Sequence, residues 1–226
     1  MMFSDNSYIN FHAHNQEAVK GGVVIQSKFL QDDLITQQSD KIFFTSGLHP
    51  WYADKLDVSE INIILEKLIK SKSIIAIGET GIDKLKGPEM GIQTKVFKVH
   101  IEIAEKYGLP LVVHSVKAHN EVLKVKIESQ SKIPWVIHNF NGSKQMAFDL
   151  INHGFYLSLS YHINNIHNRL SGYLNDLPID RLFLETDDFD IDIRDLYKTF
   201  SVKCNISVDK LKKQLIKNLN TFVHGK

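Results

Sequence analysis

Several features that would mark particular protein classes are missing from this sequence or are scarce in it. Cys204 is the only cysteine among 226 residues, which excludes an internal disulfide framework and a thiolate metal cluster. No uncharged apolar run approaches membrane-spanning length, and the opening segment MMFSDNSYIN has no basic stretch followed by a continuous apolar one. We therefore expect a compact protein of the reducing cytoplasm that makes no membrane contact.

A surplus of charge of either sign is also missing. Lysine and arginine total 27 against 26 aspartates and glutamates, so the formal net charge is only +1. This balance excludes the global basic field that is typical of nucleic-acid-binding proteins, and any polyanion site must be local. Arginine is scarce too, with only Arg169, Arg181 and Arg194, which makes lysines the expected phosphate contacts.

What is present is a series of short apolar runs rich in β-branched and aromatic residues. Eight such runs occur, at residues 8–11, 22–26, 42–46, 73–78, 110–113, 134–137, 155–160 and 181–185. Segments with helical spacing lie between them. In residues 91–108, for example, Ile92, Val96 and Val99 recur at three- and four-residue steps before Gly108 ends the helix.

Continuous apolar strands that alternate with helices are typical of parallel sheets covered by helices. Eight such units in a chain of this length favour a closed barrel over an open sheet. No linker rich in glycine or serine divides the chain. The sequence therefore predicts an α/β protein with a TIM-like (β/α)8 barrel, formed by residues 1–226 as a single domain with short helices.

The stretch YINFHAHN, residues 8–15, ends an apolar run with two histidines one residue apart. In an extended strand successive side chains alternate between faces, so His12 and His14 project on the same side and can share one metal ion. Two ordinary surface or core histidines would give the same pattern. The pair alone does not decide between these interpretations.

Active sites of this barrel class gather at the carboxyl ends of the strands, so polar residues should cluster there. Histidines and acids do follow six of the eight runs, namely His12, His14, His49, Glu79, Asp83, His114, His138 and Asp187. Packing does not explain this recurrence, whereas a metal site does. The remaining histidines are expected at the surface or as caps: His100, His119, His153, His162, His167 and His224.

Nitrogen and oxygen ligands without a thiolate suit a catalytic site for divalent ions such as Zn, Mn or Mg, without selecting among them. A carboxylate placed centrally can bridge two ions about 3.5–4 Å apart, of which one generates hydroxide and both neutralise an attacked oxyanion. Hydrolysis is the reaction class that this ligand set predicts.

The motifs, in their order along the chain, carry a family resemblance. YINFHAHN, GLHPWY, AIGETGIDK, HIEIAEKYGLPLVVHS, IHNFNGS and LFLETDD resemble those of the TatD-like metal-dependent hydrolases, or TatD DNases, from Tyr8 to about Tyr197. Membership implies a TIM-like barrel of the amidohydrolase superfamily and metal-dependent hydrolysis. In several members it also implies cleavage of DNA, commonly as an exonuclease acting on DNA ends.

The resemblance implies six ligands around two divalent ions: His12, His14, Glu79, His114, His138 and Asp187. It puts the first two histidines and Asp187 on one ion, the other two histidines on the second, and Glu79 between them. Asp187 is in addition the candidate base that orients the attacking water. Asp187 and Glu79 are therefore the expected catalytic residues.

Four further residues are expected in the substrate pocket. His49 and Asp83 resemble residues near the substrate rather than metal ligands, although His49 could merely fill the turn that Pro50 fixes. Lys84 and Lys117 should add modest local charge for a phosphate. Lys84 could equally be a solvated loop lysine.

The chain departs from the commoner family pattern at two places. Val116 stands where the family often has an arginine after the histidine of strand five. The segment that begins DDFDIDIRD at Asp187 is acidic and short. Negative charge beside the site opposes a polyanion.

Three functions therefore stay open. The first is a two-metal phosphodiesterase or deoxyribonuclease acting on DNA ends. The second is a hydrolase of a small phosphoester, ester or amide, although strand four ends in Glu79 rather than in the lysine that is often carboxylated in that superfamily. The third is a non-catalytic scaffold partner in a larger assembly, such as a defence system, which would be expected to have lost ligands. None is missing here.

Overall fold

The computed structural model describes residues 6–30 and 39–225 of the chain. Its strands are β1 (Tyr8–Ala13), β2 (Gly22–Phe29), β3 (Ile42–Gly47), β4 (Ala76–Asp83), β5 (Leu111–Val116), β6 (Trp135–Ile137), β7 (Phe155–Leu159) and β8 (Leu182–Leu184). Its α-helices are α1 (Val58–Lys70), α2 (Met90–Tyr107), α3 (His119–Ser129), α4 (Lys144–Asn152), α5 (Ile193–Lys203) and α6 (Val208–His224). The short 3-10 helices are η1 (Pro50–Tyr52), η2 (Tyr161–Asn164), η3 (Arg169–Gly172), η4 (Leu174–Asp176) and η5 (Ile179–Arg181).

The eight strands follow the chain in the order β1–β2–β3–β4–β5–β6–β7–β8 within one sheet. Every neighbouring pair whose register is defined runs parallel. The fold class is therefore α/β with a TIM-like (β/α)8 barrel, as the eight apolar runs predicted. The strand bounds differ from the predicted runs by one to five residues, most of all in β4, which begins at Ala76 rather than at residue 73 and continues to Asp83. The motif GETGID therefore lies within the strand.

The chain divides into two compact units that interleave along the sequence. Among the described residues, the first unit comprises 6–26, 39–43 and 138–225, and the second comprises 27–30 and 44–137. The single domain expected from the sequence stays a prediction. In the part of the chain that the structure describes, we find no helix whose length and apolar content would let it cross a lipid bilayer.

In the first unit, β1 is bound to the end of β8 and to α5. The Asp187 N–H donates a hydrogen bond to the His12 carbonyl at 2.9 Å. The buried Tyr197 hydroxyl of α5 accepts a hydrogen bond from the Ile9 N–H at 2.9 Å. These contacts fix the end of β1, where the two histidines lie, against the residues that follow β8.

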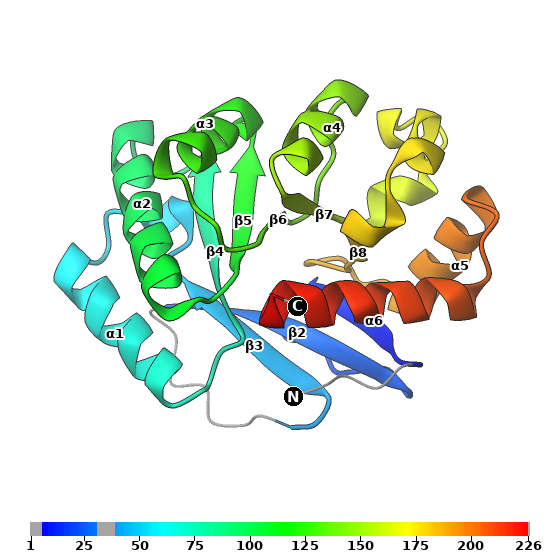
Figure 1. Ribbon diagram of the computed structural model, residues 1–226, viewed down its shortest axis with the longest axis horizontal. Coiled ribbons are helices and arrows are strands. Elements are labelled where there is room, and N and C mark those ends of the chain that lie inside the picture. The colour runs from blue at the N-terminus through cyan, green and yellow to red at the C-terminus, as the bar shows by residue number, and fades with distance from the viewer. Residues whose placement is uncertain (1–5, 31–38, 226) are drawn as a thin grey trace. The chain divides into compact units, whose positions relative to one another are not determined.

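Packing of aromatic side chains also holds β1 and β8 together. Phe11 of β1 stacks on Phe183 of β8 with ring centroids 4.0 Å apart, and Phe222 of α6 meets Phe11 edge-on at 5.4 Å. All three side chains are buried, and burial of each contributes about 1.5–3 kcal/mol to stability. Helices α5 and α6 contact each other in this unit (Figure 1).

In the second unit, two glycines let β4 and β5 approach closely. A Cβ atom on Gly78 would lie 2.3 Å from the Val112 carbonyl oxygen, and one on Gly81 would lie 2.1 Å from the His114 carbonyl oxygen. Only glycine fits at such distances. This pairing brings Glu79 beside His114. Helices α1 and α2 lie side by side in the same unit (Figure 1).

Helix α2 ends as predicted at Gly108, whose φ of 66° is left-handed. The prediction that its histidine, His100, lies at the surface or caps a helix is wrong. His100 is fully buried rather than at the surface. Its Nε2 accepts a hydrogen bond from the Leu48 N–H at 3.0 Å, and its Nδ1–H donates to the Val96 carbonyl at 2.8 Å. Burial is tolerated because both ring nitrogens are satisfied, and it lowers the pKa of His100 to about 4.

Candidate metal centre

The first unit gathers two histidines and an aspartate at the end of β1. Asp187 Oδ1 lies 3.8 Å from His12 Nε2 and 3.7 Å from His14 Nε2. These separations are too long for hydrogen bonds but close to the spacing of about 3.4 Å between ligands of a tetrahedral ion with bonds of about 2.1 Å. His12 is buried, whereas His14 and Asp187 are partly exposed. The group therefore fits a divalent ion that is reached from solvent.

Asp187 is held on its other side by an amide. Asn139 Nδ2 donates a hydrogen bond to Asp187 Oδ2 at 2.8 Å. Asn139 and Asp187 both adopt a positive φ, of 45° and 54°, which asparagine and aspartate tolerate better than most residues. Oδ1 of Asp187 is thus the oxygen that faces the histidines.

A buried glutamate supports the fourth predicted residue of this unit, His138. His138 Nδ1 lies 3.4 Å from Glu185 Oε1, which also accepts a hydrogen bond from the Asn139 N–H at 2.7 Å. A carboxylate beside Nδ1 keeps the ring proton there and leaves Nε2 as the atom that can bind a metal. The ring of His138 lies 4.3 Å from that of His12.

In the second unit, His114 lies between two carboxylates. Its Nδ1 is 3.0 Å from Glu79 Oε1, and its Nε2 is 3.1 Å from Asp83 Oδ2. All three side chains are buried. If Asp83 holds the ring proton on Nε2, Nδ1 becomes the atom that can bind a metal beside Glu79. His114 and His138 would therefore bind through different nitrogens.

Asp83 forms more hydrogen bonds than the role of a substrate-pocket residue requires. Its Oδ2 accepts a hydrogen bond from Trp51 Nε1 at 2.6 Å, and its Oδ1 accepts one from the Leu85 N–H at 2.8 Å. The side chain of Gln93 accepts from the Asp83 N–H at 2.7 Å and donates to its carbonyl at 3.0 Å. Burial opposes ionisation, but the hydrogen bonds from His114, Trp51 and Leu85 outweigh it and hold the pKa of Asp83 well below its usual range.

His49 lies beside the same glutamate, with Nε2 3.3 Å from Glu79 Oε1. Its Nδ1 accepts a hydrogen bond from the Trp51 N–H at 3.2 Å. An acceptor nitrogen carries no proton, so in the neutral ring the proton is on Nε2 and is directed at Glu79. This tautomer favours His49 as a donor in the pocket rather than as a metal ligand.

The two predicted pocket lysines differ from each other. Lys84 forms an ion pair with Glu121 of α3, so its charge is already partly compensated. Lys117 is exposed at the end of β5 and adopts a φ of 53°. A lysine that the sequence reasoning did not single out, Lys86, lies 4.2 Å above the ring of Trp51.

Each unit thus brings together four of the predicted residues: His12, His14, His138 and Asp187 in the first, and His49, Glu79, Asp83 and His114 in the second. Their roles as ligands, and that of Glu79 between two ions, stay predictions. Sequence reasoning missed Glu185, which it included in an apolar run. The sequence did contain a signal for Glu185, because a charged residue at the end of a buried apolar run needs a hydrogen-bonding or charged partner.

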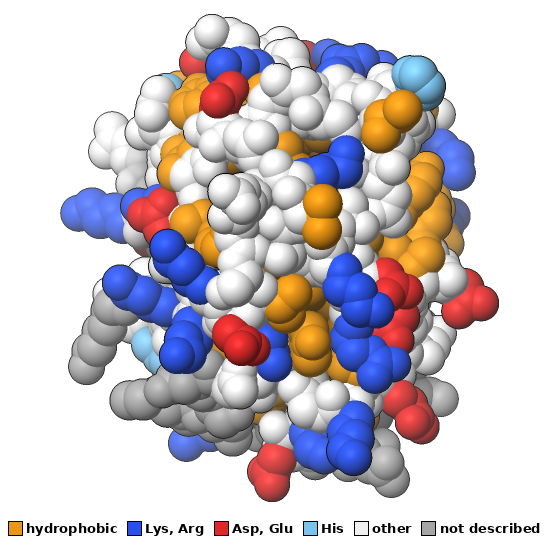
Figure 2. Space-filling model, turned by 90° about the vertical axis from the view of Figure 1, so that its right-hand side faces the viewer, with side chains coloured by type: hydrophobic (Ala, Val, Ile, Leu, Met, Phe, Trp, Pro, Cys, Tyr) orange, Lys and Arg blue, Asp and Glu red, His pale blue; other side chains and the backbone are white. Residues whose placement is uncertain are grey.

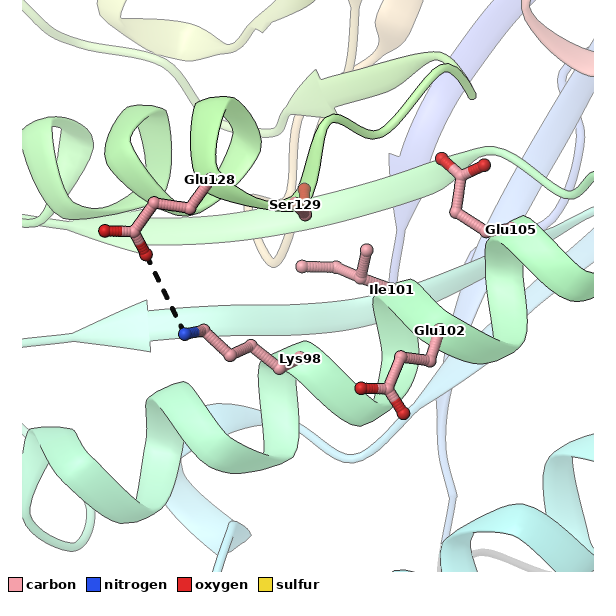
Figure 3. A pocket seen from close by; sticks show the side chains of 6 residues that line it. All are labelled: Lys98, Ile101, Glu102, Glu105, Glu128 and Ser129. Carbon is pink, nitrogen blue, oxygen red and sulfur yellow. Dashed lines mark ion pairs between the residues drawn. The ribbon is translucent and has the colours of Figure 1, made fainter.

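A separate pocket of about 470 Å³ lies between α2 and α3 in the second unit. Figure 3 shows Lys98 and Glu128 facing each other across it, with 3.8 Å between Nζ and Oε2. Glu105, which also lines the pocket, accepts hydrogen bonds from the N–H groups of Lys132 and Ile133 just before β6. The pocket therefore lies near the amino end of β6, whereas His114 is at the carboxyl end of β5.

The sequence profile of the family described as TatD related DNase matches residues 9–222. The chain is 31% identical over 173 residues to an uncharacterized metal-dependent hydrolase of Buchnera aphidicola, covering 71% of this chain and 64% of the relative. It is 32% identical over 162 residues to the uncharacterized metal-dependent hydrolase YcfH of Escherichia coli, covering 69% and 58%. The chain thus spans less than two thirds of the length of these relatives.

Solved structures show the same fold at lower identity. A TatD family hydrolase from Entamoeba histolytica superposes with a TM-score of 0.82 at 17% identity, over 100% of both chains. The TatD homologue YjjV from Escherichia coli superposes with a TM-score of 0.81 at 18% identity, over 96% of this chain and 97% of that one.

Proposed function

This chain belongs to the TatD-related DNase family of metal-dependent hydrolases, and from that premise we propose that it is a two-metal phosphodiesterase acting on DNA ends. The observation that supports the proposal best is the pairing of each of two candidate ligand histidines with a buried acid. His114 is paired with Asp83, and His138 with Glu185. Metal-ligating histidines in hydrolytic enzymes are oriented in this way.

Two divalent ions would supply Lewis acidity, which activates water and neutralises negative charge on the attacked phosphate. The family resemblance assigns one ion to His12, His14 and Asp187, and the other to His114 and His138. Zn, Mn and Mg are all compatible with such ligands. Glu79 as a ligand of both ions remains a prediction of the family resemblance.

The side chains around the ligands have distinct tasks in this proposal. Asp187, whose Oδ2 accepts a hydrogen bond from Asn139, would orient the attacking water and accept its proton. Asp83 and Glu185 keep the ring protons of their histidines away from the ligand nitrogens. His49 directs its Nε2 proton toward Glu79 and so steadies that carboxylate.

Binding to DNA should depend weakly on salt. On the face shown in Figure 2, lysine and arginine side chains are interspersed with acidic ones, which agrees with the net charge of +1. Each phosphate neutralised on a single strand contributes about −0.7 to the log–log salt slope. Contact limited to a strand end therefore predicts a shallow slope, on the order of −1 to −3.

The test begins with protein stripped of metal by a chelator. Mg, Mn or Zn is then added, and hydrolysis of 3′- and 5′-labelled single-stranded DNA is compared with hydrolysis of phosphodiester, ester and amide model substrates. We expect metal-dependent release of nucleotides from one end of the DNA. His12→Ala should abolish it, whereas the matched control His153→Ala, at the exposed end of α4, should not.

Hydrolysis of the small substrates without cleavage of DNA would instead favour the second candidate function. The observation that favours it is the pair of exposed acids, Asp188 and Asp190, beside Asp187, since negative charge there opposes a polyanion. Failure to hydrolyse any substrate, or to bind metal, would favour a scaffold role. A cytoplasmic location remains an inference from the single cysteine.

A further inference from the structure

The loops that follow β7 and β8 in the first unit carry a pair of aromatic side chains that the candidate metal centre does not use. Tyr161 begins η2, and Phe189 lies two residues after Asp187. Their ring centroids are 3.9 Å apart, with the ring planes inclined by 47°. Among the phenylalanine, tyrosine and tryptophan side chains of the described residues, Tyr161 alone is exposed, with an accessibility of 36%.

The pair is fixed in place by backbone and side-chain contacts. Gln16 Nε2 donates a hydrogen bond to the Phe189 carbonyl at 3.1 Å. The Phe189 N–H donates to the Thr186 carbonyl at 3.0 Å, which closes a turn around Asp187. The ring of His162 also lies near that of Tyr161, with the centroids 4.2 Å apart. A preformed aromatic surface binds a ligand with little loss of conformational freedom.

The position of this pair points to an uncharged planar ligand. The turn that holds Phe189 also holds Asp187, so a group that contacts the aromatic pair lies next to the candidate metal group. Phe189 is flanked by Asp188 and Asp190, both exposed, and their negative charge disfavours a phosphate at this spot. An aromatic surface bordered by carboxylates instead suits a ring whose edge carries N–H donors, as every unpaired DNA base does.

We propose that Tyr161 and Phe189 form a stacking surface for the unpaired base at the end of a DNA strand. This proposal rests on the proposed function and narrows its substrate class to single-stranded or frayed ends, because a base inside a duplex cannot reach an aromatic side chain. Stacking on aromatic residues tolerates every base and contributes roughly 5- to 150-fold to affinity. It would hold the terminal nucleotide while its phosphodiester meets the metal group.

Oligonucleotides of one sequence provide the test. One carries normal ends, and two others replace the terminal nucleotide at the 5′ or the 3′ end with an abasic tetrahydrofuran residue. The measured quantity is the ratio of kcat/KM for the normal strand to that for the abasic strand at the end that is attacked. We expect the wild type to favour the base at least 5-fold. Tyr161→Ala should bring the ratio near one, and Tyr161→Phe should retain it.

Tyr107→Ala, which removes a tyrosine from α2 in the second unit, is the matched control and should leave the ratio unchanged. A second readout is the fluorescence of 2-aminopurine at the strand end, measured in EDTA. Stacking should quench it with the wild type and not with Tyr161→Ala. Cleavage with a ratio near one in the wild type would overturn the stacking surface and leave the phosphodiesterase intact. Quenching that depends on Tyr161 without any cleavage would support the surface and overturn the phosphodiesterase.

Discussion

Replacing His100 with glutamine should make the stability of the protein less sensitive to acid. His100 is buried in α2 with a pKa of about 4, lowered from an ordinary value of 6.5 by burial. Between these pH values the unfolded chain takes up a proton that the folded chain does not, so the free energy of unfolding falls as the pH falls from 6.5 to 4. Above pH 6.5 the contribution is fully present.

The size of the effect follows from the shift. Each pKa unit corresponds to about 1.4 kcal/mol, so protonation of the unfolded state removes about 3 kcal/mol of stability at pH 4 and about 2 kcal/mol at pH 5. Glutamine does not titrate but can replace both hydrogen bonds of His100. Its amide oxygen can accept from the Leu48 N–H, and its amide nitrogen can donate to the Val96 carbonyl.

The assay is urea unfolding followed by tryptophan fluorescence, in EDTA, at pH 7 and at pH 5. Between the two pH values the wild type should lose about 2 kcal/mol more stability than His100→Gln. Equal losses would refute the reasoning. His119→Gln offers an independent check, because burial also lowers the pKa of His119 to about 4, and its removal should reduce the acid sensitivity in the same direction.

Other perturbations test the candidate site and the core. Asp83→Asn should weaken metal binding about 10- to 100-fold in calorimetric titration, since both carboxylate oxygens accept hydrogen bonds; unchanged affinity would contradict the orienting role. Glu79→Gln should lower the occupancy of both metal positions, whereas His138→Ala should chiefly lower the occupancy of one, and mass spectrometry of the intact protein counts the bound metals. Full occupancy in Glu79→Gln would exclude Glu79 as a ligand shared by both ions. Phe97→Ala, in the core of the second unit against Trp135, should cost about 3–5 kcal/mol in urea unfolding, and a loss below 1 kcal/mol would show that the site repacks.

The fold was predictable because its signals are local. Each strand is a short run of β-branched and aromatic residues, and the end of α2 is marked by a glycine, Gly108, that adopts the left-handed conformation. The candidate ligands were equally predictable from the sequence, because a parallel barrel places the carboxyl ends of all its strands on the same side. His12, His114 and His138 could therefore be selected from the sequence by their position after an apolar run.

The residues that orient those ligands could not be selected in this way. Gln93 can form its hydrogen bonds to Asp83 only because α2 packs against the end of β4. No local sequence pattern in either element predicts that contact. The same holds for Trp51, whose indole N–H finds Asp83 more than thirty residues away. His100 was misassigned because its burial depends on one backbone N–H that a distant loop supplies.

The hydrogen bonds between β1 and the residues that follow β8 determine the order in which parts of the chain can assemble as it leaves the ribosome. Tyr197, which accepts a hydrogen bond from Ile9, and Thr186, which accepts one from Asn10, lie 188 and 176 residues further on. At about 5–20 residues per second, the first strand waits roughly 10–40 s for them. His49, Glu79 and His114 are all made well before that point. The group around His12 is therefore the last to assemble during synthesis, and for that interval the edge of β1 that is not paired with β2 is exposed to mispairing with other chains.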